Sequence, residues 1–141
     1  MSQIIPAWRD NILEPIDKLT VHELGLKHPA ISVFVMKGHK ILLQQRAATK
    51  YHSPNLWTNT VCTHPNWNEP SEICAQRRLQ EELNITGLNL VFKGKIEYRA
   101  NVGNDLIEHE VVTIFSCSIS NDLDLFVKPN QEEVSNVDWK T

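Results

Sequence analysis

Two short apolar, β-branched runs lie close together in the first third of the chain. Residues 31–36 form the first run, a turn at 37–39 contains Gly38, and residues 40–45 form the second run. Two such runs around a glycine turn predict a β-hairpin. Further strand-like runs lie at 57–61, 88–92, 94–99 and 106–118. Strands therefore dominate the pattern.

One segment has the features of an amphipathic helix. Pro70 and Ser71 suit its first turn, and Asn84 is the expected stop, so the helix is predicted to end at Leu83. Its buried side is expected to hold the apolar and small residues Ile73, Cys74, Ala75, Leu79 and Leu83. A single clear helix among several strands predicts the mixed α+β class.

Composition narrows the class of protein further. A chain of 141 residues fits one domain, and its net charge of −3 argues against nonspecific binding to nucleic acid or to a membrane surface. No apolar run reaches the ~18 residues of a membrane span, and the start of the sequence lacks the layout of a signal peptide. The three cysteines, Cys62, Cys74 and Cys117, indicate free thiols in a reducing cytoplasm.

Five side chains are candidate metal ligands: His22, His28, His64, Glu108 and Glu110. Imidazole with carboxylate suits Mn²⁺, Zn²⁺ or Fe²⁺, whereas Mg²⁺ prefers oxygen ligands. Strand alternation places Glu108 and Glu110 on one face and His109 on the other. The alternatives are a solvated acidic face for the two glutamates and surface positions for His22 and His28, which we expect in an irregular segment.

Further candidates are scattered along the chain. Cys62 and His64 are two residues apart and share a face of an extended segment, so they could reach one site as a thiol and an imidazole ligand or base. The alternative, favoured for this pair alone, is a buried free Cys beside a surface His. Tyr98 is expected to face the core together with Ile96. Four cationic residues would suit a diphosphate if they converge on one pocket, and each is otherwise ordinary surface charge: Lys18, Arg46, Lys50 and Arg78.

The segment from Glu69 to Ile85 resembles the Nudix box, G-x5-E-x7-R-E-U-x-E-E-x-G-U, where U is a bulky apolar residue. The matching positions are Glu69, Arg77, Leu79, Glu81, Glu82 and Ile85. Three positions depart from it: Thr63 replaces the first Gly, Arg78 the Glu after Arg, and Asn84 the last Gly. These departures, together with the stretch WTNTVCTHP at 57–65, resemble the type I isopentenyl-diphosphate isomerases, a branch of the Nudix superfamily.

This resemblance implies a fold and a reaction. The expected fold is a Nudix-type mixed β-sheet sandwiched by helices, in one compact domain over residues 1–141. About residues 1–28 would contribute ligands, and the C-terminal segment that covers the pocket in this family would be missing. The implied reaction interconverts isopentenyl and dimethylallyl diphosphate for isoprenoid biosynthesis.

The resemblance also implies roles for single residues. Cys62, Glu110 and Tyr98 would be catalytic, and one divalent ion, Mn²⁺ or Zn²⁺, would be held by His22, His28, His64, Glu108 and Glu110. Glu82 and the main-chain carbonyl of Cys62 would meet a second ion, Mg²⁺. The diphosphate would be bound by Lys18, Arg46, Lys50 and Arg78. The partner would be a small allylic or homoallylic diphosphate, with no nucleic acid and no membrane insertion, and the protein would be a cytoplasmic monomer or weak homodimer.

Two other functions fit parts of the sequence. A Nudix hydrolase of a nucleoside diphosphate derivative would release phosphate or monophosphate with Mg²⁺ and would not need Cys62. Arg78, in place of a glutamate of the Nudix box, disfavours this function. A catalytically inactive diphosphate-binding module would bind tightly without turnover, and the set Cys62, Tyr98, Glu108 and Glu110 speaks against it.

Overall fold

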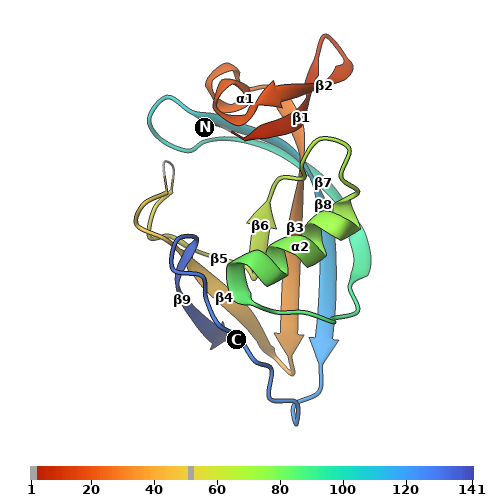
Figure 1. Cartoon of the computed structure of the whole chain (residues 1–141), viewed down its shortest axis with the longest axis vertical. Helices are drawn as coiled ribbons and strands as arrows, with labels where there is room; N and C mark the ends of the chain where they lie inside the picture. Colours follow the sequence, from red (N-terminus) through yellow and green to blue (C-terminus); the bar gives the residue numbers. More distant parts are fainter. Residues whose placement is uncertain (1–2, 51–52) are drawn as a thin grey trace.

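The computed structural model describes residues 3–50 and 53–141, and its central feature is the predicted hairpin. Strands β3 (Lys27–Lys37) and β4 (Lys40–Arg46) form it, and Gly38 adopts a φ of 61° in the turn. The two strands pair only next to the turn, at Met36 with Ile41 and Lys37 with Lys40. Further along, β3 pairs with β6 (Val61–Thr63) instead, so β3 and β4 diverge (Figure 1).

The strands form a mixed sheet, as predicted. Its order is β5-β4-β3-β8-β7, with β6 paired to β3 and β9 (Val134–Lys140) paired to β4. The central pair, β3 with β8 (Ile107–Ile119), is parallel, and the other pairs are antiparallel. The predicted runs at 88–92 and 94–99 belong to one strand, β7 (Val91–Asn101), which has an irregularity between Phe92 and Gly94. The predicted run at 57–61 is divided between β5 (Trp57–Thr58) and β6.

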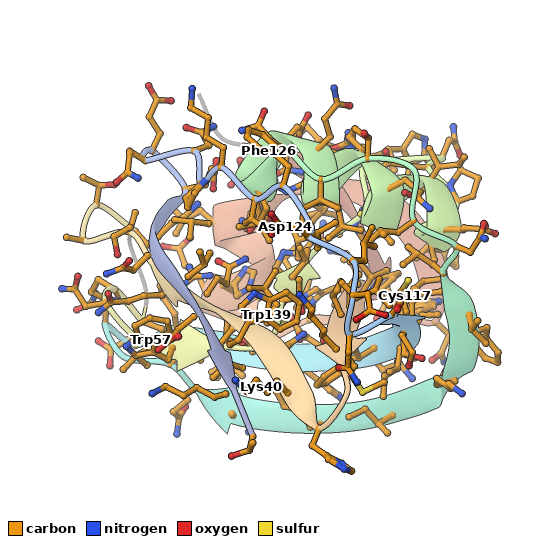
Figure 2. The ribbon with its side chains drawn as sticks, turned by 90° about the horizontal axis from the view of Figure 1, so that it is seen from below. Lys40, Trp57, Cys117, Asp124, Phe126 and Trp139 are labelled. Atoms are coloured by element: carbon orange, nitrogen blue, oxygen red, sulfur yellow. The ribbon has the colours of Figure 1, made fainter. Side chains whose placement is uncertain are left out.

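Helix α2 (Ser71–Leu83) confirms the predicted helix and its ends. Asn84 closes it in the left-handed conformation at φ 57°. The helix packs on β3 and β6 through Ala75, Leu79 and Leu83. Ile73 was expected on this buried side and is instead 57% exposed, because the helical period places it on the far side from Ala75 and Leu79. Seen from below, α2 lies on one side of the molecule and β7 and β8 on the other, with Trp139 of β9 between them (Figure 2).

The N-terminal part is more regular than the sequence predicted. Strands β1 (Ile4–Arg9) and β2 (Ile12–Asp17) form a separate hairpin, and helix α1 (Lys18–Leu24) follows directly. The prediction that His22 and His28 lie in an irregular segment is therefore wrong, since His22 lies on α1 and His28 on β3. The sequence pattern did not predict these strands, because each of them contains a proline. Pro6 and Pro15 lie opposite each other in the two-stranded β1–β2 sheet, where an edge tolerates the missing amide donors.

Candidate active site

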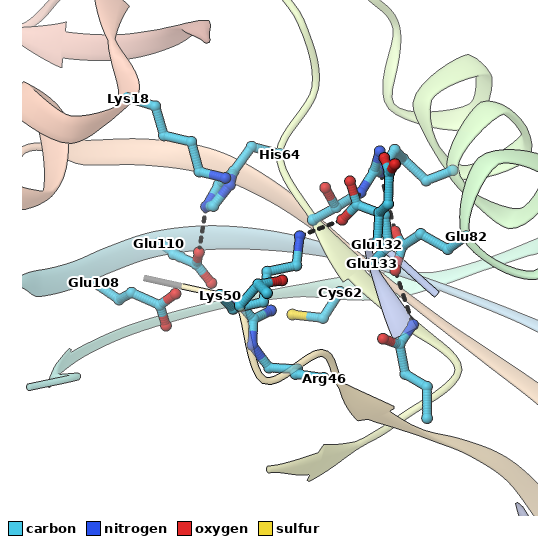
Figure 3. Close-up of a pocket in the computed structure, with 14 residues that line it drawn as sticks. Lys18, Arg46, Lys50, Cys62, His64, Glu82, Glu108, Glu110, Glu132 and Glu133 are labelled. Atoms are coloured by element: carbon cyan, nitrogen blue, oxygen red, sulfur yellow. Dashed lines mark hydrogen bonds and ion pairs between the residues drawn. The ribbon is translucent and has the colours of Figure 1, made fainter. Parts of the chain in front are cut away.

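A cavity of about 270 Å³ lies where β3 and β4 diverge (Figure 3). Its lining comes from α1, β4 and the segment that follows it, β6 and the residue after it, α2, β8 and the turn before β9. Most of the predicted site residues line it: Lys18, Arg46, Lys50, Cys62, His64, Arg78, Glu82, Glu108 and Glu110. The remaining three, His22, His28 and Tyr98, contact members of this set. The structure therefore brings all the predicted residues into one region.

Strand register accounts for much of this convergence. Glu108 and Glu110 project from β8 into the cavity, and His109 projects from the opposite face, as the alternation predicted. In the parallel β3–β8 pair, His28 lies opposite Glu110. In the antiparallel β7–β8 pair, Tyr98 also lies opposite Glu110. Glu110 is thus flanked by an imidazole on one side and a phenol on the other.

Three histidines form a buried cluster at one end of the cavity. The ring centroids of His22, His28 and His64 are 4.8–5.4 Å apart. Nδ1 of His22 lies 2.8 Å from the carbonyl oxygen of Lys18, and Nδ1 of His28 lies 2.8 Å from that of Leu26. A carbonyl only accepts, so each Nδ1 carries the proton and donates it. The Nε2 atom of each ring then keeps a lone pair, the state in which imidazole binds a metal.

The donor chemistry of this cluster fits a divalent ion. Burial lowers the pKa of His22, and it lowers the pKa of His64 to about 3, so both rings are neutral at neutral pH. Ligand atoms of His22, His28 and His64 lie within 4.8 Å of one another, and so do those of His64, Glu108 and Glu110. Neutral imidazoles and carboxylates together suit transition metals. His64 links the two groups, because its Nε2 lies 2.8 Å from Oε2 of Glu110.

Tyr98 joins the two carboxylates of β8. Its Oη lies 2.6 Å from Oε1 of Glu110 and 3.1 Å from Oε2 of Glu108. Burial raises the pKa of Glu108, and the Glu110 charge raises it further. Burial acts in the same direction on Glu110, but the nearby imidazoles of His28 and His64, whose Nε2 atoms lie 3.4 and 2.8 Å from its Oε2, outweigh burial and hold the Glu110 pKa below its usual range. The expectation that Tyr98 and Ile96 both face the core is wrong, since Ile96 is 53% exposed and the phenol bonds carboxylates.

The Cys62 sulfur points into the same cavity (Figure 3). Cys62 lies opposite Ser32 in the β3–β6 pair, and the Ser32 hydroxyl donates a hydrogen bond of 3.7 Å to Sγ. Burial, together with the charge of Glu110, raises the pKa of the thiol to about 12. Cys62 is therefore protonated at neutral pH in this structure and can donate a proton to a group that enters the cavity.

Four cationic side chains also line the cavity: Lys18, Arg46, Lys50 and Arg78. The part of the cavity where Lys50 and Arg78 meet Glu133 is called its cationic end below. Burial lowers the pKa of Lys18 to about 8, and the charges of Lys50, Arg46 and Arg78 add to this effect. That mutual repulsion shows that four side chains from separate segments converge on one place. Such a cluster is suited to binding an anion with several oxygens.

Glu82 of α2 lies beside this cationic end and is fixed from two sides. Arg78 Nε donates to its Oε2 at 3.0 Å, and Gln44 Nε2 donates to its Oε1 at 2.9 Å. Burial raises the Glu82 pKa. A buried, oriented carboxylate of this kind is an oxygen ligand suitable for Mg²⁺.

Sequence reasoning did not predict five of the residues that line the cavity, and two of these, Gln44 and Glu133, contact predicted site residues. Gln44 left a signal, because it is polar at an inward position of β4, where its neighbour Leu42 is buried in the core. Glu133 left none, since it lies in an irregular turn before β9. It forms ion pairs with Lys50 and Arg78.

Fold and site together define a NUDIX protein, and the NUDIX domain family matches residues 26–141. Solved structures agree on the fold. A protein of Deinococcus radiodurans superposes with a TM-score of 0.75 over 99% of this chain and 83% of its own, at 14% identity. A MutT NUDIX hydrolase from Burkholderia pseudomallei gives a TM-score of 0.65 over 80% of this chain and 81% of its own, at 17% identity.

Curated relatives are much more similar in sequence. An isopentenyl-diphosphate Delta-isomerase of Cereibacter sphaeroides is 55% identical over 99% of this chain and 77% of its own length. An enzyme of the same name from Rhodobacter capsulatus is 51% identical over 97% of this chain and 77% of its own. The chain therefore belongs to the NUDIX family, in the branch of these isopentenyl-diphosphate Delta-isomerases.

Membership of the NUDIX family implies dependence on a divalent metal, and the His and Glu groups described above are candidate ligands. Among residues 3–50 and 53–141, neither helix has the length and apolar character that crossing a membrane requires.

Proposed function

We propose that this chain is an isopentenyl-diphosphate isomerase that converts isopentenyl diphosphate into dimethylallyl diphosphate. The observation that carries the proposal is one cavity with a thiol, a phenol-linked carboxylate pair and a cluster of cations. The names of relatives at 51–55% identity support it over a hydrolase or an inactive binding module. Arg78 also argues against a hydrolase, because it brings a cation into the cavity where the Nudix box has a glutamate.

The reaction moves a double bond by one carbon. A proton adds to the terminal methylene carbon of the alkene, the π electrons form the new C–H bond, and a tertiary carbocation results. Loss of a proton from the neighbouring methylene carbon, whose C–H electrons become the new π bond, gives the product. We assign the two proton positions to Cys62 on one side of the substrate and to Glu110, hydrogen-bonded by Tyr98, on the other. An unactivated alkene is a weak base, so the reaction requires a strong acid next to the alkene. Water must also be excluded, because it would trap the carbocation.

We propose two divalent ions for this site. His22, His28, His64, Glu108 and Glu110 would hold Mn²⁺ or Zn²⁺, and Glu82 with the main-chain carbonyl of Cys62 would meet Mg²⁺. When bound, the ions supply positive charge next to the carboxylates and the diphosphate. The formal charges that line the cavity also indicate that a diphosphate needs additional positive charge in order to bind. The cavity is lined by five glutamates against four cationic side chains, a net negative charge that would repel a diphosphate.

The diphosphate of the substrate would be bound by Lys18, Arg46, Lys50 and Arg78. Arginine can offer two parallel N–H donors to a phosphate, and lysine acts as a point charge. This arrangement fixes the diphosphate at one end of the cavity and leaves the hydrocarbon end near Cys62 and Glu110. We further propose a cytoplasmic monomer or weak homodimer, in keeping with the three free cysteines, and light scattering of the purified chain tests the oligomeric state.

The test is an NMR assay of isopentenyl diphosphate in D₂O with Mg²⁺ and Mn²⁺. The expected product is deuterium-labelled dimethylallyl diphosphate from the unmodified chain and none from Cys62→Ala. Cys117→Ala is the matched control, since Cys117 is a second free thiol on the distant part of β8. Release of inorganic phosphate or monophosphate would instead indicate a hydrolase. Binding without conversion would indicate a binding module.

A further inference from the structure

Glu133 occupies the cationic end of the cavity in this structure. Its Oε2 forms an ion pair with Lys50 Nζ and lies 3.3 Å from Nη2 of Arg78. The turn that carries Glu133 is held against the end of α2, because the amide of Asn130 donates to the carbonyl oxygen of Glu82 at 2.8 Å. The Glu133 carbonyl oxygen also accepts from the amide of Ala47 at 3.1 Å. Backbone contacts on both sides therefore place this carboxylate among the cations.

Arg78 shows why this position matters for an anionic ligand. Its Nε donates to Glu82 at 3.0 Å, its Nη1 to Glu81 at 2.9 Å and its Nη2 to Glu133 at 3.3 Å. All three nitrogens of the guanidinium therefore face a carboxylate. A phosphate group that accepts two parallel hydrogen bonds from this planar group therefore competes with these carboxylates for its donors.

Glu133 is the carboxylate that a diphosphate would replace. Glu81 and Glu82 lie on the same helix as Arg78, within one turn, and Gln44 fixes Glu82. Glu133 belongs to a different segment and contacts Lys50 as well as Arg78. A ligand that displaces Glu133 gains hydrogen-bond donors from two cations at once.

We propose that Glu133 occupies the diphosphate subsite in the ligand-free protein and is displaced by the diphosphate of the substrate. This inference rests on the proposed function, which assigns Lys50 and Arg78 to the diphosphate. Glu133 is then a positioning residue that acts through these two cations. It keeps them directed into the cavity and weakens the binding of any anion by competing for the same donors.

Calorimetric titration of the full chain with inorganic pyrophosphate at a fixed, saturating Mg²⁺ concentration tests the proposal. Glu133→Gln removes the competing charge, so pyrophosphate should bind about tenfold more tightly, the scale of one hydrogen bond to a charged group. Glu132→Gln is the matched control. Glu132 also lines the cavity, but the structure gives it no ion pair among the described residues, so its affinity change should stay within about twofold.

A structural defect cannot imitate the expected gain, because damage to the site weakens binding. Equal effects of Glu133→Gln and Glu132→Gln, or weaker binding by Glu133→Gln, would overturn the competition. The KM for isopentenyl diphosphate should fall in Glu133→Gln along with the pyrophosphate dissociation constant. Lys50→Met separates the two proposals. Unchanged pyrophosphate affinity in this variant would refute the diphosphate site itself, whereas weaker binding there with no gain in Glu133→Gln would refute only the role of Glu133.

Discussion

Gln44 offers a sharp test of how the site is built. Its side chain is 3% exposed, and its Nε2 donates to Oε1 of Glu82 at 2.9 Å and to the carbonyl oxygen of Thr60 at 2.7 Å. Gln44→Leu keeps a similar volume but removes both donors. A hydrogen bond to a charged group contributes about 1.5–3 kcal/mol, and a buried carbonyl left unsatisfied costs about 1–3 kcal/mol. Part of this loss is offset by the burial of leucine, so we expect a net destabilisation of about 2–4 kcal/mol.

Thermal unfolding measures this loss directly. For a domain of this size, 2–4 kcal/mol corresponds to a fall in melting temperature of roughly 6–15 °C. Gln45→Leu is the control on the neighbouring position of β4, where Nε2 donates to the carbonyl oxygen of Asn55 at 3.0 Å in an exposed setting. Its melting temperature should fall by less than about 4 °C. Equal losses in the two variants would refute the reasoning that Gln44 stabilises the buried carboxylate.

The pH dependence of stability is a second, independent test of the hydrogen bond between Gln44 and Glu82. Burial raises the Glu82 pKa in the folded state, so ionisation of Glu82 disfavours folding, and stability falls as pH rises from the unfolded pKa to the folded one. Gln44→Leu removes a donor to the charged form and should raise the folded pKa further. The fall in stability should therefore be larger in the variant and extend to higher pH. Urea unfolding between pH 4 and about 8 follows it.

Three further predictions can each be tested by one kind of measurement. Because the Lys18 pKa is lowered to about 8, chiefly by burial, pyrophosphate should bind more weakly as pH rises above 8; calorimetry should find this dependence lost in Lys18→Met. Leu79→Ala should destabilise the fold by about 2–5 kcal/mol in urea unfolding, because Leu79 is fully buried under α2. Ile73→Ala, at an exposed position, should change stability by less than about 0.5 kcal/mol. Mn²⁺ added to chelator-treated protein at 100 times its dissociation constant should stabilise it by about 2.7 kcal/mol, and His28→Ala should abolish the gain in melting temperature.

Short-range signals carried most of the fold prediction. The hairpin turn at Gly38 and the helix stop at Asn84 were both recognisable, because each depends on a residue that tolerates positive φ at one position. Strands β1 and β2 were missed because Pro6 and Pro15 conflict with a central strand and are tolerated only at an edge, a property of the assembled sheet. The burial of Ile73 was misjudged for a related reason. Hydrophobicity alone does not fix which side of a helix meets the sheet.

The residues of the candidate site also divide into those that a local pattern predicted and those that it did not. Glu108 and Glu110 could be placed on one face from strand alternation, and the structure confirms it. The resemblance to a family supplied the rest of the set, since no spacing rule joins His22 on α1 to Glu110 on β8. Glu133 could not be found by either route. Its contact with Arg78 spans 55 positions of the sequence and depends on the backbone bonds that hold its turn to α2.

The location of the histidine cluster connects the fold to the metal. The β1–β2 hairpin and α1 have a small apolar core of their own, formed by Ile5, Ala7, Ile16 and Val21, separate from the core under α2. His22 comes from this N-terminal unit, whereas His28 lies on β3 of the main sheet and His64 directly follows β6. Imidazoles buried together at this boundary lose their contact with water, and the ion proposed for them would restore strong interactions. The proposed metal in this cluster would therefore hold the N-terminal unit to the sheet, and with it Lys18 in the cavity, so that metal binding would also complete the proposed diphosphate site.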